Sequence, residues 1–183
     1  MMLLLALAIQ SAPLLQDRAF LDTHAAWVAC TNRIVDDQFG SSRSAERIAT
    51  DALFGCRGQE AEVRRAVNAF SGATQGQHDM AVLLNGSREG LIERVAERRR
   101  RMAAYSAAAT TWFRCTRTRI EAASSDPEQA VIDAAFAACS RDEATLRAAA
   151  LRVFGREAAA DRMMSESRAL ALEGMRNFLR NRR

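Results

Sequence analysis

Apolar residues in this chain recur at steps of three, four and seven positions, the spacing that places them on one face of an α-helix. Such a stripe predicts a first helix over residues 14–38. A glycine and a run of serines end it, and Ser44 is a suitable N-cap for a second helix over 45–54. A third helix is predicted over 59–70, because a Ser-Gly pair follows it.

The pattern of this stretch occurs a second time further along the chain. The spacing from the aromatic residue through Trp to Cys-Thr is identical in both copies, and the second Cys is followed at the fourth position by Glu both times. The matched positions are Phe20 with Tyr105, Trp27 with Trp112, Cys30 with Cys115, Thr31 with Thr116, Cys56 with Cys139 and Glu60 with Glu143. All four cysteines and both tryptophans belong to this pattern. Because the rarest residue types recur together, we predict that the chain is a tandem duplication.

The second copy contains helices of its own. Residues 85–87, Asn-Gly-Ser, predict a turn, after which an unbroken helical pattern runs over 88–123 and joins the two copies. An Asp-Pro pair with Gln two residues later signals the start of a helix over 126–139. Further helices are predicted over 142–154 and 156–179, separated by a glycine.

The first residues predict an export signal. Residues 1–9 are an unbroken apolar run, far shorter than the roughly 20 residues of a membrane-spanning helix, and small residues follow at Ser11 and Ala12. No basic residue precedes the run, and Pro13 disfavours cleavage directly after Ala12. We interpret residues 1–12 as a signal peptide with an open cleavage site, and we expect the protein to be exported, in the periplasm.

Export and the cysteines support each other. An even number of cysteines in a small exported chain favours disulfides. Zinc sites usually take ligands in close pairs, whereas the cysteines here are widely spaced, so we predict no metal and no cofactor. The tryptophan one helical turn before the first cysteine of each copy is expected to cover the bridge. Residues of an antiparallel helix pair meet at similar heights above the connecting turn, which pairs Cys30 with Cys56 and Cys115 with Cys139.

These elements predict the fold class. Few prolines and aromatic residues and many alanines are typical of helical proteins. We predict an all-α fold of two tandem disulfide-stapled helical units joined by one long helix. The first unit is expected to span residues 13–97 and the second residues 98–183.

Charge adds one local feature. All 26 basic residues are arginine, with a formal net charge of +4 and a pI near 9.3, which allows an acidic partner. Four arginines are consecutive in the long helix and form a collar, because helical neighbours are 100° apart: Arg98, Arg99, Arg100 and Arg101. Two interpretations stay open, a solvated stretch with Glu93 and Glu97 as neighbours or a site for the phosphates of lipids or nucleic acid. The lack of stacking aromatics around it disfavours nucleic acid.

Catalytic chemistry has little support in the sequence. No phosphate-binding loop, nucleophile elbow or zinc-protease pattern is present. His24 and His78 are isolated, and isolated histidines are most often surface or partly buried polar residues. Glu60 and Glu143 start the third helix of each copy, where they favour the helix dipole and could pair with an arginine one turn later, Arg64 or Arg147.

We therefore predict a non-catalytic exported helical protein that binds another envelope protein or an envelope polymer. The last helix offers an adaptable apolar face with Met163, Met164 and Met175, although packing onto its own bundle is the commoner use of such a face. The first alternative is a basic module that binds anionic lipid or nucleic-acid phosphates through the four arginines. The second is an enzyme of unfamiliar type, which needs a polar pocket that holds Glu60 or Glu143 with a His. The oligomeric state stays open.

Overall fold

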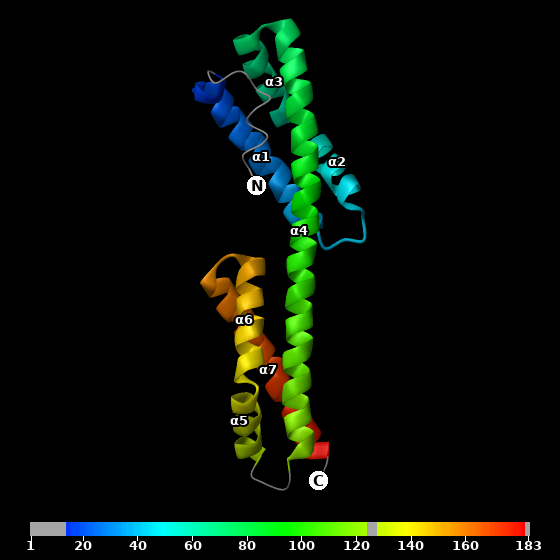
Figure 1. Ribbon diagram of the computed structural model, residues 1–183, viewed down its shortest axis with the longest axis vertical. Helices are drawn as coiled ribbons and strands as arrows, with labels where there is room; N and C mark the ends of the chain where they lie inside the picture. Colours follow the sequence, from blue (N-terminus) through cyan, green and yellow to red (C-terminus); the bar gives the residue numbers. More distant parts are fainter. Residues whose placement is uncertain (1–13, 124–127, 182–183) are drawn as a thin grey trace. The chain divides into compact units, whose positions relative to one another are not determined.

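The computed structural model describes residues 14–123 and 128–181, and within these ranges every regular element is helical. The chain divides into two compact units, Met1–Arg99 and Arg100–Arg183. One long helix, α4 (Ala73–Ala122), contributes its first part to unit 1 and its second part to unit 2 (Figure 1). The all-α prediction is confirmed. The predicted signal peptide, residues 1–12, lies outside the described residues.

Unit 1 begins with a short 3-10 turn, Leu14–Gln16, before its first helix. Three helices follow, α1 (Arg18–Gln38), α2 (Ala45–Gly55) and α3 (Arg57–Ser71), and residues 73–99 of α4 complete the unit. Asp17 and Ser44 cap α1 and α2, each through a side-chain oxygen that accepts a hydrogen bond from a backbone N–H three residues later. Helix α1 packs against both α2 and α3.

The core of unit 1 consists of two adjoining clusters of apolar side chains. The first surrounds the disulfide and includes Trp27, Val63, Val67 and Met80. The second joins α1, α2 and α4 through Val35, Ile48, Ala49, Ala52, Leu91 and Val95. Helix α4 therefore contributes core residues along the length of this unit.

Unit 2 repeats the order of elements. Residues 100–122 of α4 are followed by α5 (Glu128–Ala138), α6 (Ser140–Phe154) and α7 (Glu157–Asn181). Its core contains Trp112, Ile120, Ile132, Cys139, Leu146, Met164 and Met175. The predicted helix start at Asp126 and Pro127 lies outside the described residues.

The predicted turn at residues 85–87 is wrong, because α4 continues through it from Ala73. Asn and Gly disfavour a helix interior by only about 1 kcal/mol each relative to Ala. Met80, Leu91 and Val95, on either side of this point, are all buried in the core of unit 1, and their packing requires a continuous helix. Tertiary packing thus overrides the local turn signal. The break that does occur is at Gly72, whose φ of 77° is accessible chiefly to glycine.

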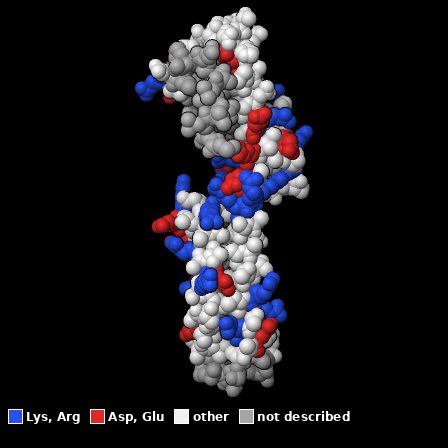
Figure 2. Space-filling model, viewed as in Figure 1, with Lys and Arg blue, Asp and Glu red and all other residues white. Residues whose placement is uncertain are grey.

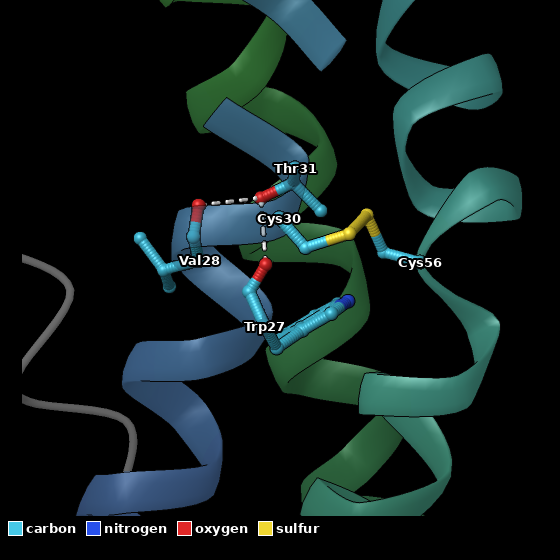
Figure 3. Close-up of a disulfide and its surroundings, with 5 residues drawn as sticks. All are labelled: Trp27, Val28, Cys30, Thr31 and Cys56. Atoms are coloured by element: carbon cyan, nitrogen blue, oxygen red, sulfur yellow. Dashed lines mark hydrogen bonds between the residues drawn. A yellow bond between two sulfur atoms is a disulfide. The ribbon is translucent and has the colours of Figure 1, made fainter. Parts of the chain in front are cut away.

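Both predicted disulfides are formed. Cys30 bonds to Cys56 and Cys115 to Cys139, each with Cα atoms 6.0 Å apart. Figure 3 shows the first bridge beside Trp27, with the Thr31 hydroxyl donating to the backbone carbonyls of Trp27 and Val28. The second threonine, Thr116, donates in the same way to the backbone carbonyls of Trp112 and Phe113, four and three residues earlier in α4.

The two units also match at their helix junctions. Cys56 and Cys139 each lie between two helices, and each donates its backbone N–H to carbonyls three and four residues earlier. Gly72 and Gly155 end the next helix in each unit, both with positive φ, 77° and 68°. Trp27 and Trp112 are both buried, and neither indole N–H has a hydrogen-bond partner within the described part of the chain. The sequence repeat is therefore also a repeat of local structure.

Candidate binding groove

A groove lined mainly by apolar side chains lies within unit 2, between α4 and α7. Its volume is about 320 Å³, at the lower end of the range of ligand-binding clefts. The wall from α4 consists of Phe113, Thr116, Arg117 and Ile120. The wall from α7 consists of Leu170, Ala171, Gly174, Met175 and Phe178. Arg117 is thus the single charged residue among the described residues of the lining.

The rim of this groove on α7 is exposed. Leu170 has 65% and Phe178 37% of its surface accessible, and both count among the exposed large apolar residues. Isolated exposed apolar residues are normal on protein surfaces, but two that flank a groove form a patch. On the face shown in Figure 2, unit 2 displays uncharged surface interrupted by separate basic and acidic groups.

The spacing of residues on α7 explains why these two side chains are exposed. The buried stripe of this helix is Ala160, Met164, Ser167, Ala171 and Met175, at steps of three and four. Leu170 and Phe178 lie next to this stripe rather than on it, so packing onto α6 and α4 leaves them at the edge. Of the three methionines proposed as a partner-binding face, Met164 and Met175 are buried in the protein's own core and Met163 is half-buried. The exposed apolar face is therefore formed by other residues.

Unit 1 has different residues at the equivalent positions of α4. Residues of α7 match residues 84 positions earlier, as Met164 matches Met80, and both of these are buried. By this correspondence Gly86 takes the place of Leu170, and Arg94 takes the place of Phe178. Nη2 of Arg94 lies 3.6 Å from the Asp36 carboxylate. The apolar rim is thus a property of unit 2.

Charge at the groove comes from Arg117. Its side chain is 78% exposed, and its Nε donates to Glu121 Oε1 at 2.6 Å. This hydrogen bond, with the negative charge of Glu121, raises the pKa of Arg117 above its usual value. The guanidinium is therefore positively charged at every physiological pH.

Of the four consecutive arginines, Arg98, Arg99 and Arg101 make hydrogen bonds to residues of their own unit. Arg98 Nη2 lies 2.7 Å from Asp36 Oδ1 of α1. Arg99 donates to the carbonyls of Phe39 and Ser41 at 2.9 Å, and also to that of Arg43. Phe39 is the C-cap of α1, where a cation is favoured by the helix dipole, and Ser41 and Arg43 belong to the loop before α2.

The other two arginines belong to unit 2. Arg101 Nη1 donates to the Arg152 carbonyl in the last turn of α6, at 3.3 Å. Arg98 thus has an acidic partner on another helix, Asp36 of α1, which the sequence did not predict. Phosphate binding by Arg98, Arg99, Arg100 and Arg101 stays a prediction.

The recurring glutamates occupy two different environments. Glu60 Oε1 lies 2.7 Å from Arg64 Nη2, so the predicted pair one turn along α3 is confirmed. Glu143 instead pairs with Arg168 of α7, whose Nη2 lies 2.9 Å from Glu143 Oε2. The predicted Glu143–Arg147 pair is wrong, because α7 packs against α6 and brings its own charges within reach.

A polar cleft surrounds this second pair. It lies between α6 and α7 and also contains Arg147 and Asp161, whose Nη2 and Oδ1 atoms are 2.7 Å apart. Both carboxylates of the cleft are thus held in ion pairs. Its lining contains no histidine.

Both histidines belong to unit 1. His24 lies between two aromatic rings of α1, with centroids 5.4 Å from Phe20 and 6.0 Å from Trp27. Partial burial lowers its pKa below 6.5 and favours the neutral ring. His78 is exposed on α4. In the part of the chain that the structure covers, no three His, Cys, Asp or Glu side chains are grouped so that they could hold a metal ion.

Comparison with family models, with curated proteins and with solved structures finds no significant match. Over residues 14–123 and 128–181, no helix combines the length and hydropathy required to cross a lipid bilayer.

Proposed function

We propose that this chain is a non-catalytic exported protein that binds another protein of the cell envelope. The observation that carries the proposal is the groove of unit 2, where Leu170 and Phe178 expose apolar surface beside a concave site. Apolar grooves with exposed large side chains are typical of protein-binding surfaces. The described chemistry fits this role, since the acids of the polar cleft are neutralised by arginines of the same cleft.

Two disulfides support export. Both bridges join helices within a single unit, and disulfides of this structural kind persist in oxidising compartments. The apolar run at residues 1–9 provides an export signal of suitable length. We place the protein in the periplasm on these grounds.

Photo-crosslinking in native cells tests this proposal. A photoreactive amino acid is introduced at Leu170, and at Phe54 as a matched control, because their exposed fractions are 65% and 63%. We expect the Leu170 site to yield a discrete adduct with an exported protein, identified by mass spectrometry, and the Phe54 site to yield none. Equal adducts from both sites, no adduct at Leu170, or an adduct with a cytosolic protein would contradict the proposal.

The phosphate-binding alternative has a separate test. Replacing all four consecutive arginines with Gln should leave binding to anionic vesicles unchanged at physiological salt if the collar only makes contacts within the protein. If the collar binds phosphates, affinity falls steeply with added salt, and each lost contact reduces the salt slope by nearly one unit. Sub-micromolar vesicle binding that the Gln variant abolishes would make this alternative the preferred function.

A further inference from the structure

We propose that the groove of unit 2 receives an amphipathic helix of its partner, with an apolar stripe flanked by acidic residues. This inference rests on the proposed binding function and specifies the partner's chemistry. Three features carry it: the length of the groove, its floor and its charge.

The length matches two turns of a helix. The wall from α4 extends from Phe113 to Ile120, and the wall from α7 from Leu170 to Phe178. At about 1.5 Å per residue these walls are roughly 10 and 12 Å long. Anchors at positions i, i+3 or i+4, and i+7 of a bound helix span about the same distance, which is how amphipathic helices occupy apolar grooves.

The floor of the groove allows a partner helix to approach it closely. Ala171 and Gly174 are the smallest residues of the lining, and a Cβ added to Gly174 would meet no heavy atom within 4 Å. Gly90, the matching residue of unit 1, is equally uncrowded, so the glycine alone does not mark a site. Unit 2 differs in the large apolar residues at the ends of its floor, where unit 1 has Gly86 and Arg94. Two helices pack at about 8–10 Å between axes, a distance that small floor residues favour.

Charge selects acidic flanks. Among the described residues of the lining, Arg117 is the one that is charged, and its ion pair with Glu121 offsets part of that charge, so the net charge of the unit carries most of the argument. Residues 100–183 contain 15 arginines and 10 acids, a net charge of +5, whereas residues 1–99 contain 11 arginines and 12 acids, a net charge of −1. Opposite charge across an interface raises the association rate and excludes partners of like charge. An acidic helix therefore suits unit 2 and does not suit unit 1.

The test uses the full chain and a displayed library of helical peptides of about 20 residues, long enough to form helix in isolation. The matched variants are Gly174→Leu, which fills the groove, and Gly90→Leu, which adds the same side chain at the corresponding site of unit 1. Both replace a helix glycine and should preserve or raise stability, which thermal unfolding by circular dichroism verifies. Arg117→Gln tests the charge.

We expect selected peptides to carry an apolar stripe flanked by acids. Gly174→Leu should weaken their binding by at least about tenfold, because the anchors are excluded, while Gly90→Leu changes it by less than about twofold. Arg117→Gln should weaken binding a few-fold and flatten its salt dependence. Basic or unpatterned peptides, no enrichment, or equal loss in both glycine variants would overturn the inference.

Two further outcomes separate other occupants from the proposed one. A dimer of the full chain in analytical ultracentrifugation that Gly174→Leu abolishes would replace the partner helix with a second copy. Binding of a fluorescent fatty acid that the same variant abolishes, without peptide enrichment, would replace it with an amphiphile. If crosslinking at Leu170 captures an exported protein and the library yields no acidic helix, the proposed function stands and this inference fails.

Discussion

The two units share one scaffold but differ in how the side chains of their last helical segment are used. In unit 1, α4 presents Arg94 and Arg98 to Asp36, and these side chains form ion pairs between α4 and α1. In unit 2 the corresponding face of α7 carries Leu170 and Phe178 beside an open groove. The buried positions that build the core and the disulfide are alike in both. A duplication can therefore preserve its core in both copies while surface positions of one copy change from charged or small residues to large apolar ones.

The glutamate after each second cysteine shows the same divergence. Glu60 pairs within α3, whereas Glu143 pairs with Arg168 of α7. By the same correspondence Arg168 takes the place of Leu84 in unit 1. The hydrogen bond to Glu143 raises the pKa of Arg168. A surface pair of this kind contributes at most about 1 kcal/mol, so it orients α7 more than it stabilises it.

The largest expected effect concerns the disulfides. Replacing Cys115 with Ala should lower the free energy of unfolding by roughly 2–5 kcal/mol, and Cys30→Ala should do the same, because the bridges span 24 and 26 residues. Each unit contains one Trp, so urea unfolding followed by tryptophan fluorescence measures one unit at a time in chains where the Trp of the other unit is replaced by Phe. A strong loss in one unit and none in the other would break the equivalence.

The next largest effect is expected at Gly76 of unit 1, which is closely packed against Asn68. A Cβ at Gly76 would lie 3.0 Å from the Cα of Asn68, so Gly76→Ala should destabilise unit 1 by about 1–3 kcal/mol. Unit 2 already has Ala160 at the matching position, buried in its core. Gly90→Ala is the control, because an uncrowded helix glycine should gain about 0.5–1 kcal/mol. Stabilisation by Gly76→Ala would show that α3 and α4 are less closely packed.

Arg99 should contribute less to the free energy of unfolding than these residues do. Replacing it with Gln removes its hydrogen bonds to the carbonyls of Phe39, Ser41 and Arg43 and should cost about 1–2 kcal/mol. An exposed arginine of α1, Arg33, serves as control, and its Gln variant should stay within about 0.5 kcal/mol of the parent. Equal stability of both variants would mean that Arg99 is available to an external ligand.

His24 should give the smallest effect, confined to unit 1. Its folded-state pKa lies below 6.5, so the unfolded chain binds more protons between the two pKa values. The stability that neutral His24 contributes is therefore present above about pH 6.5 and is lost as the pH falls through that window. Unfolding of unit 1 between pH 7.5 and 5 should be less pH-dependent in His24→Gln. Unit 2 contains no histidine, and an equal response there would refute this origin.

The sequence alone predicted the helices, the duplication and both disulfide pairs, because these depend on rare residues and local periodicity. It failed at residues 85–87, where the burial of Met80 and Leu91 outweighs the turn signal. It also missed the groove. The methionine stripe of α7 could not be assigned to the core before its packing was known. The ion pair of Arg98 could not be predicted either, because its acid is 62 residues away in the sequence. Leu170 and Phe178, two turns apart with Ala171 and Gly174 between them, were the available signal.

The central claim is that one disulfide-stapled helical unit occurs twice in a protein that folds in an oxidising compartment. Non-reducing peptide mapping of the protein isolated from native cells tests it most directly. We predict two links, Cys30 to Cys56 and Cys115 to Cys139, with no free thiol and no link between the units. Free cysteines, or a link from Cys30 to Cys115, would contradict the account.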